Sequence, residues 1–264
     1  PHRYAGNSPD PDDKRRRSAP DANLADQYHL VNISTLIAAA RADGRVALDE
    51  FNGKQILAES GLAVPNGVVV ADETALDSAL MDLSPPYAVK VISADIIHKS
   101  DAGGVAIGLA NNAAVGNAIQ AMRDRLHPGG AKVDGYIVEE MAAPGHELVM
   151  GAVQDPQFGP LVMIGLGGVF VEIFEDVAFR IFPLTRHDAI DMLDELKAAP
   201  VLAGARGGAA VNRELIVEAL LKFGGEGGLL AKHAGAFTEI DINPLIVSND
   251  AAVAVDARFV LVPS

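Results

Sequence analysis

The chain alternates between helical and extended hydrophobic periodicities along most of its length. Apolar residues that recur every three or four positions predict helices over residues 32–42, 48–59, 72–81, 112–126, 185–196 and 213–223. Short apolar or alternating runs predict strands around Lys90 and over residues 67–70, 105–110, 134–141, 147–153, 161–164, 169–174, 178–182, 237–247 and 251–260. Mixed helix and strand units come first, and a mostly antiparallel sheet with helices follows, which indicates an α/β (α+β) fold.

Capping residues support the boundaries of two of these helices. Asp72 is placed to cap the helix at 72–81. Thr185 and Asp188 form a capping-box pattern before the helix at 185–196. The glycine cluster at 224–228 predicts a flexible break.

Composition narrows the class of protein. The 264 residues are 49% hydrophobic but only 5% aromatic, without Trp, so small aliphatic residues must form the core. Residues 1–30 are rich in Pro, Asp, Arg and Ser and have few apolar residues to bury, so we expect a flexible tail or linker. No cysteine is present, which excludes a disulfide framework and is compatible with the cytoplasm.

Charge and hydropathy bear on the partners. The formal net charge of −14 argues against a general nucleic-acid binder, which needs a basic face. No apolar run approaches the roughly 20 residues of a membrane span. A nucleotide is also anionic, so any nucleotide site in this acidic chain must offset the negative charge locally with cations, backbone N–H groups and a metal.

A short β-branched strand with Lys90 at its centre leads into a polar loop that contains His98 and ends in Gly103-Gly104. An unpaired buried ammonium is costly, and a bound phosphate would supply the missing partner of Lys90. His98 could then accept or hold a phosphoryl group. Taken alone, a lysine such as Lys90 is more often a solvated residue on an open strand face, and a histidine such as His98 is more often an ordinary loop histidine.

The C-terminal hairpin offers a candidate metal site. Period-two alternation places Glu239, Asp241 and Asn243 on one face, and the return strand can bring Asp256 beside them. Oxygen ligands on one sheet face suit Mg²⁺, which also binds phosphates. A solvated polar face is the alternative, although the Asn243-Pro244 pair is hard to explain as plain strand.

Two further segments are candidates for nucleotide contacts. The glycine-rich turn at 165–168 can bring backbone N–H groups close to a phosphate, although a hairpin turn needs glycine just as much. Arg180, a cation within a predicted strand, either contacts phosphate or pairs with Glu172 or Asp176.

Four segments in this order, KVISADIIHKSDAGGV, GLGGVFVEIFEDVAFRIFPL, GARG and EIDINPL, resemble the ATP-grasp part of the NDP-forming acyl-CoA synthetases. The resemblance runs from about Ile33 to the C-terminus and is nearest to the β subunits of the ADP-forming acetyl-CoA synthetases. It implies an ATP-grasp fold of two α/β subdomains with the nucleotide between them. Residues 31–110 would supply the N-terminal subdomain elements, and residues 111–264 the remainder with the nucleotide and Mg²⁺ sites.

The resemblance also implies roles for individual residues. His98 would be a phosphohistidine on a loop that swings between two sites, and Lys90 would bind phosphate. The adenine hinge would be formed by Glu139, Glu140 and Met141. Glu147 would be the ribose carboxylate. The loop over the phosphates would contain Gly165, Gly167 and Gly168. The Mg²⁺ ligands would be Asp241, Asn243 and Asp256.

This family interconverts acyl-CoA, ADP and phosphate with acid, CoA and ATP. No CoA-binding domain is visible in the sequence, so we expect a CoA-binding α subunit or domain with its own phosphohistidine, and a hetero-oligomer. That partner would bring the acyl-CoA or carboxylate and the phosphate. One alternative is a free-standing ligase that forms an acyl phosphate directly and does not need His98. Another is a nucleotide-binding module without turnover.

Overall fold

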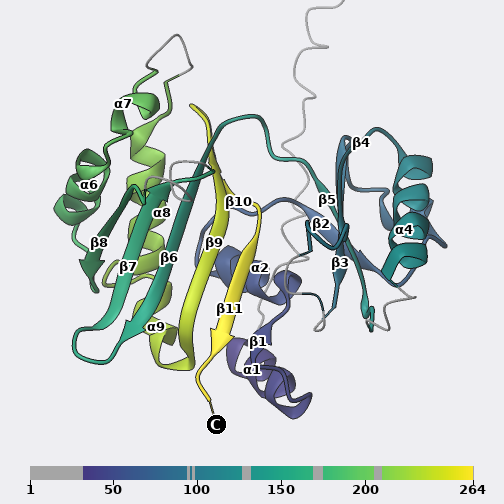
Figure 1. Cartoon of the computed structure of the whole chain (residues 1–264), viewed down its shortest axis with the longest axis horizontal. Helices are drawn as coiled ribbons and strands as arrows, with labels where there is room; N and C mark the ends of the chain where they lie inside the picture. The colour runs from purple at the N-terminus through teal and green to yellow at the C-terminus, as the bar shows by residue number, and fades with distance from the viewer. Residues whose placement is uncertain are drawn as a thin grey trace, which may run out of the picture.

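The computed structural model describes residues 32–93, 96, 99–126, 132–168, 175–204 and 210–263. Two sheets dominate it, one of seven strands and one of four, and they lie side by side in Figure 1. The larger sheet has the order β1-β11-β9-β6-β7-β8, with β10 paired to β9, and the smaller has the order β2-β5-β3-β4. A mixed α/β architecture of two parts is therefore present, as predicted.

The smaller sheet holds the strand of Lys90. It consists of β2 (Gly67–Val70), β3 (Tyr87–Ile92), β4 (Val105–Leu109) and β5 (Gly135–Glu140), all paired antiparallel. The amphipathic helix α4 (Asn112–Leu126) packs its apolar side, including Val115 and Ile119, on this sheet beside the short helix α3 (Leu76–Ala79). Strands from before and after residue 110, the subdomain boundary predicted from the sequence, thus belong to one sheet.

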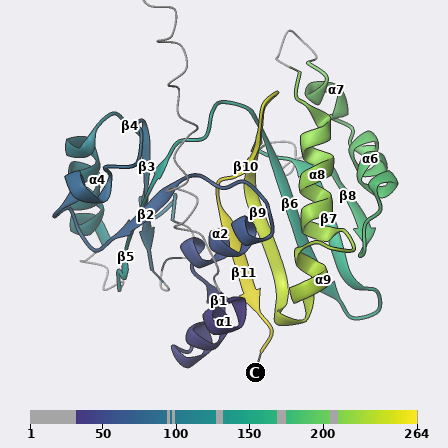
Figure 2. The ribbon, with the colours of Figure 1, turned by 180° about the vertical axis from the view of Figure 1, so that it is seen from behind.

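The larger sheet is covered on one face by helices, as Figure 2 shows. Its long strands are β6 (His146–Asp155), β7 (Gly159–Leu166) and β9 (Phe237–Val247), and the shorter ones are β1 (Ala47–Leu48), β8 (Val177–Ile181), β10 (Ala252–Ala254) and β11 (Ala257–Leu261). The helical elements are α6 (Arg186–Glu195), α7 (Ala199–Leu202), α8 (Arg213–Gly224), α9 (Leu229–His233) and the 3₁₀ turn η5 (Ala234–Ala236). Apolar side chains of the sheet and of α6 to α9 form the main core.

Helix α2 (Glu50–Glu59) lies between the two sheets (Figures 1 and 2). It follows α1 (Ile33–Ala42) and packs against β11, where Gly53 is so close to Phe259 that an added Cβ would meet its ring at 3.0 Å. On its other side α2 reaches the smaller sheet through charged side chains. It is therefore the element that joins the two parts.

Several boundaries follow local signals, whereas others depend on distant contacts. The Thr185–Asp188 capping box is confirmed. The helix predicted at 72–81 is wrong in length, because the Asp72 side chain accepts the Thr74 N–H in a local turn and only Leu76–Ala79 is helical. Gly224 is the last residue of α8, and residues 225–228 form a short turn before α9. The predicted strand at 169–174 lies outside the described residues.

The predicted return strand at 251–260 is interrupted. It forms β10 and β11, with Val255 and Asp256 between them. This interruption frees the Val255 carbonyl and places Asp256 beside the site described below. Among the described residues, no helix combines the length and the apolar character needed to cross a membrane.

Candidate functional site

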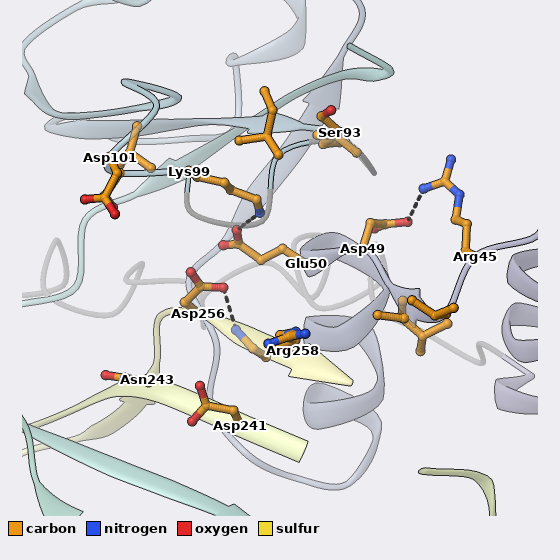
Figure 3. A pocket seen from close by; sticks show the side chains of 18 of the residues that line it. Arg45, Asp49, Glu50, Ser93, Lys99, Asp101, Asp241, Asn243, Asp256 and Arg258 are labelled. Carbon is orange, nitrogen blue, oxygen red and sulfur yellow. Dashed lines mark hydrogen bonds and ion pairs between the residues drawn. The ribbon is translucent and has the colours of Figure 1, made fainter. Parts of the chain in front are cut away.

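A cleft of about 800 Å³ opens where α2, the segment after β3 and the C-terminal hairpin meet (Figure 3). Its walls carry many charged and polar side chains from these three regions. Three of the predicted site residues, Asp241, Asn243 and Asp256, line it. The segments that contribute to this cleft are residues 43–50, 92–101 as far as described, 241–243 and 256–258.

A buried set of opposite charges forms one wall of the cleft and extends behind it; we call it the lysine–glutamate cluster, and it comprises Glu50, Lys54, Lys90, Lys99 and Glu139. Glu50 Oε1 lies 2.6 Å from Lys90 Nζ and 2.7 Å from Lys54 Nζ, and Glu50 Oε2 lies 2.6 Å from Lys99 Nζ. Glu139 pairs with Lys54 and lies 3.2 Å from Lys90. Glu50 is therefore the centre of the cluster.

Electrostatics favour the ionised forms of Glu50 and Lys90. Burial alone would raise the pKa of the Glu50 carboxyl, but three surrounding ammonium groups outweigh burial and hold that pKa well below its usual range. Burial alone would lower the pKa of Lys90, but the carboxylates of Glu50 and Glu139 raise it above its usual range. Three ammonium groups face two carboxylates within the cluster, and Asp256 beside it supplies a third carboxylate, which also attracts Lys90.

Lys90 differs from the prediction in two respects. Its side chain is 6% exposed, so the solvated-strand alternative is wrong. The premise that phosphate would supply a missing partner is also wrong, because Lys90 already forms ion pairs with Glu50 and Glu139. Its ammonium also donates a hydrogen bond of 2.7 Å to the Val255 carbonyl. Lys90 instead links the smaller sheet to α2 and to the interruption between β10 and β11.

The acidic face of the C-terminal hairpin, formed by Asp241, Asn243 and Asp256, has the predicted alternation. Ile240 and Ile242 are buried on the helix-covered side, while Asp241 and Asn243 point to the cleft (Figure 3). Asp256 adjoins them, since the Asn243 N–H donates to its carbonyl at 3.2 Å.

Burial and neighbouring negative charges destabilise the ionised forms of the two carboxyl groups on this face. Burial raises the pKa of Asp256, and repulsion by Glu50 adds to this against the attraction of the lysines. Burial also raises the pKa of Asp241, with repulsion from Glu239 and Asp256. A hard divalent cation bound by these oxygens would relieve both penalties. Among the described residues no three His, Cys, Asp or Glu side chains form a metal cluster, so such a cation would need further ligands from water or phosphate.

The predicted hinge residues lie at the crossing between the sheets, outside the cleft of Figure 3. The Glu139 side chain belongs to the lysine–glutamate cluster. Glu140 accepts hydrogen bonds from the Ser84 N–H at 2.7 Å and from Asn66 at 2.9 Å. Met141 is 38% exposed, and its Sδ accepts the Gly108 N–H at 3.0 Å. The backbone N–H groups of Glu140 and Met141 are already bonded within the protein.

Glu147 and the glycine turn are brought together. The Gly167 N–H donates to the Glu147 carbonyl at 2.7 Å, and an added Cβ at Gly167 would lie 3.0 Å from that oxygen. Gly165 pairs with Val149 within the sheet, and Gly168 has a φ of +61°, which favours glycine. The predicted phosphate loop thus adjoins the predicted ribose carboxylate.

Arg180 lies elsewhere. It is on the edge strand β8, which β6 and β7 separate from β9, and its guanidinium binds both oxygens of Glu195 at 2.9 and 2.5 Å. Asp176 instead accepts the backbone N–H groups of Lys197 and Ala198. Of the two predicted carboxylates, Asp176 therefore does not pair with Arg180, and Glu172 lies outside the described residues.

His98 also lies outside the described residues, but its neighbour Lys99 is described and belongs to the cluster. Sequence reasoning missed Glu50, Lys54 and Lys99. A signal for the first two was present, because Glu50 and Lys54 are four residues apart on a helix and share the face of the apolar Leu57. A helix that places a Glu–Lys pair on its buried face needs charged partners from another element.

Comparisons with known proteins agree with this geometry. The model of the ATP-grasp domain family matches residues 39–261. The acetate–CoA ligase [ADP-forming] I subunit beta of Pyrococcus furiosus is 41% identical over 228 residues, which cover 86% of this chain and 96% of that protein.

Two solved structures of the dinucleotide-forming acetyl-coenzyme A synthetase 1 of Ca. Korarchaeum cryptofilum are also similar. One, with coenzyme A and Mg-AMPPCP and with its phosphohistidine segment pointing towards the nucleotide binding site, has a TM-score of 0.75 at 36% identity, covering 87% of this chain and 100% of that one. The other, with coenzyme A, acetyl-coenzyme A and a phosphorylated phosphohistidine segment in the site I orientation, has a TM-score of 0.78 at 34% identity, with the same coverage.

Proposed function

The chain belongs to the ATP-grasp domain family and, within it, to the beta subunits of the ADP-forming acetate–CoA ligases, and from this premise we propose that it moves a phosphoryl group between His98 and ADP. The observation that carries the proposal is the lysine–glutamate cluster next to the acidic face in one cleft. A phosphoryl-transfer site needs cations for the nucleotide phosphates and oxygens for a metal, and this cleft supplies both.

The transfer requires little covalent assistance from the protein. A terminal oxygen of ADP attacks the phosphorus of phosphorylated His98, and the N–P bond breaks as ATP forms. The ring nitrogen released from phosphorus takes up a proton from water, so the imidazole leaves neutral. Alignment and charge neutralisation supply the catalysis. Lys90 is the cation that we expect to meet the phosphates, as the family resemblance implies; it lies behind the cleft, paired with Glu50, which lines the cleft.

The acidic face suits Mg²⁺, which would be held by Asp241, Asn243 and Asp256. Bound there, the ion would supply charge neutralisation at the nucleotide phosphates. The donor set fits, since all three side chains offer oxygen and the two carboxyl groups carry raised pKa values that a cation would relieve.

The remaining nucleotide contacts follow the family resemblance. Adenine would lie near Glu139, Glu140 and Met141 at the crossing between the sheets, and ribose would meet Glu147. The glycine turn at 165–168 would close over the phosphates. Arg180 fits this arrangement least well, because Glu195 already satisfies its guanidinium.

A beta subunit implies a partner subunit, and this partner would bind CoA and carry the second phosphohistidine. The carboxylate or acyl-CoA and phosphate would react on the partner, so this chain would contribute the nucleotide half of the reaction in a cytoplasmic hetero-oligomer. The structures with coenzyme A described above support this division.

The test is incubation of the purified chain with Mg²⁺ and ATP labelled at the γ-phosphate. We expect acid-labile, base-stable label that disappears in His98→Ala and falls strongly in Lys90→Met. If His98→Ala retains full activity in forming an acyl phosphate, the chain is a free-standing ligase instead. If the wild-type chain binds nucleotide but takes up no label, it is a binding module and the proposal is wrong.

A further inference from the structure

One ion pair of the cluster differs from the others in exposure. Lys99 Nζ lies 2.6 Å from Glu50 Oε2, and the Lys99 side chain is 17% exposed whereas Glu50 is 1% exposed. The other oxygen of Glu50 is fixed by Lys54 and Lys90, which are 0% and 6% exposed. Lys99 is therefore the member that can leave the cluster while the rest stays buried.

The backbone of Lys99 is also held. Its carbonyl accepts the Gly104 N–H at 2.7 Å, and the Gly104 carbonyl accepts the Val91 N–H of β3 at 2.8 Å. Gly103 completes this turn with a φ of +71°. Side chain and backbone thus anchor the residue that directly follows His98, the side chain to α2 and the backbone to β3.

Covalent geometry limits what residue 98 can do while this anchor persists. Consecutive Cα atoms are about 3.8 Å apart, so the Cα of His98 stays within that distance of the Cα of Lys99. Rotation about a fixed neighbour can turn the imidazole but cannot carry it to a distant site. Yet the phosphohistidine segment of the Korarchaeum relative takes two orientations, one of them towards the nucleotide.

We propose that Lys99 is a positioning residue: its ion pair with Glu50 keeps the residue next to His98 at the nucleotide cleft, and this pair breaks, together with the hydrogen bond from the Gly104 N–H to the Lys99 carbonyl, whenever the phosphoryl group travels to the partner. The inference rests on the proposed function, since it concerns where His98 acts. Glu50 serves as a fixed counter-charge, because Lys54 and Lys90 keep it ionised and in place after Lys99 leaves.

A second role for Lys99 must be distinguished from this one. Lys99 lines the cleft, so its ammonium could instead bind a nucleotide phosphate directly. A phosphate ligand contributes to nucleotide affinity, whereas a positioning residue contributes to transfer after the nucleotide has bound. Measuring affinity and single-turnover rate separately therefore separates the two roles.

The variants are Lys99→Met, which removes the charge at similar length, and Lys99→Arg, which keeps it. Lys232→Met, at an exposed lysine of α9, is the matched control. In single-turnover labelling at saturating Mg-ATP we expect Lys99→Met to transfer at least about tenfold more slowly, because a charge-assisted hydrogen bond to a buried carboxylate is lost. ADP affinity should stay within about twofold, and Lys99→Arg should recover most of the rate.

Mobility provides a readout that does not depend on chemistry. The chain has no cysteine, so Ser100→Cys gives a single spin-label position beside Lys99. The label should become more mobile in Lys99→Met but not in Lys232→Met, also in a His98→Ala background. An unchanged rate and mobility in Lys99→Met, or lost ADP affinity with an unchanged saturating rate, would overturn the inference. If the wild-type chain takes up no phosphoryl group from ATP, the proposed function fails, and the mobility of the spin label alone then decides whether the Lys99 anchor exists.

Discussion

Replacing Glu50 by Gln tests the cluster on which the cleft is built. The carboxylate is 1% exposed and accepts from three ammonium groups, at 2.6, 2.7 and 2.6 Å. A glutamine amide keeps the volume but has one acceptor oxygen and two donor hydrogens, so its NH₂ group must face a lysine ammonium. Among the described residues, Glu139 would remain as a fully buried counter-charge for these lysines, with the half-buried Asp256 nearby.

The magnitude follows from the burial of the pair. Removing one partner of a buried ion pair costs about 3–5 kcal/mol, because the remaining charge stays desolvated. We expect a loss near the lower limit, about 3 kcal/mol in the free energy of unfolding at pH 7. The reason is that Lys90 keeps the Val255 carbonyl and Lys99 can turn towards solvent.

The pH dependence has a definite sign. Because the folded-state pKa of Glu50 lies below its ordinary value of 4.5, its stabilising contribution is fully present above pH 4.5. The contribution decreases as the pH falls below that value, since the unfolded chain then binds a proton that the folded chain does not. The difference in the free energy of unfolding between wild type and Glu50→Gln should therefore narrow as the pH falls from about 5 to about 3.5, that is, from about half a unit above to about one unit below the ordinary pKa of 4.5.

The assay is urea unfolding at pH 7 and along that acid series. Glu59→Gln is the matched control, because Glu59 is exposed at the other end of the same helix. It should change stability by less than about 0.5 kcal/mol. A Glu50→Gln variant as stable as this control, or a difference that widens in acid, would refute the account of the cluster.

Three further predictions concern the acidic face, the turn after Lys99 and a helix start. Asp256→Asn should reduce Mg²⁺-dependent labelling at least about a hundredfold. The pKa of Asp256 is raised in the folded protein, so its negative charge destabilises the fold as the pH rises. In urea unfolding without Mg²⁺, Asp256→Asn should therefore be more stable than wild type at pH 8 and equally stable in acid. Gly103→Ala should lose more stability in urea than Gly108→Ala, since both have positive φ, which costs about 1–2 kcal/mol, but only the Gly103 Cβ would meet a side chain, that of Arg125; equal losses would contradict this. Thr185→Ala should lower the free energy of unfolding by about 1 kcal/mol through loss of the capping box, and an unchanged urea midpoint would show that the cap does not contribute.

Local signals in the sequence were sufficient for much of the fold. The helix at 112–126 follows from its apolar spacing, and β9 from the strict alternation around Ile240 and Ile242. The Thr185–Asp188 capping box fixes the start of α6. In each case the residues that decide the structure lie within a few positions of one another, so one segment contains the whole signal.

The cluster could not be predicted in the same way, because its contacts span the chain. Glu50 and Lys90 are 40 residues apart, Lys54 and Glu139 are 85 apart, and Lys90 reaches a carbonyl 165 residues away. Periodicity identifies a buried lysine as unusual but not its partners. For the same reason the sequence suggested phosphate as the partner of Lys90, whereas tertiary packing supplies two glutamates.

The central claim is tested most directly by following one peptide. Trypsin cuts after Lys90 and Lys99, so residues 91–99 are released as a peptide whose only histidine is His98. After incubation with Mg-ATP and digestion at alkaline pH, mass spectrometry should find one phosphoryl group on this peptide. Adding ADP before digestion should remove it while an equal amount of ATP forms. A phosphoryl group on any other peptide, or one that ADP fails to remove, would contradict the account.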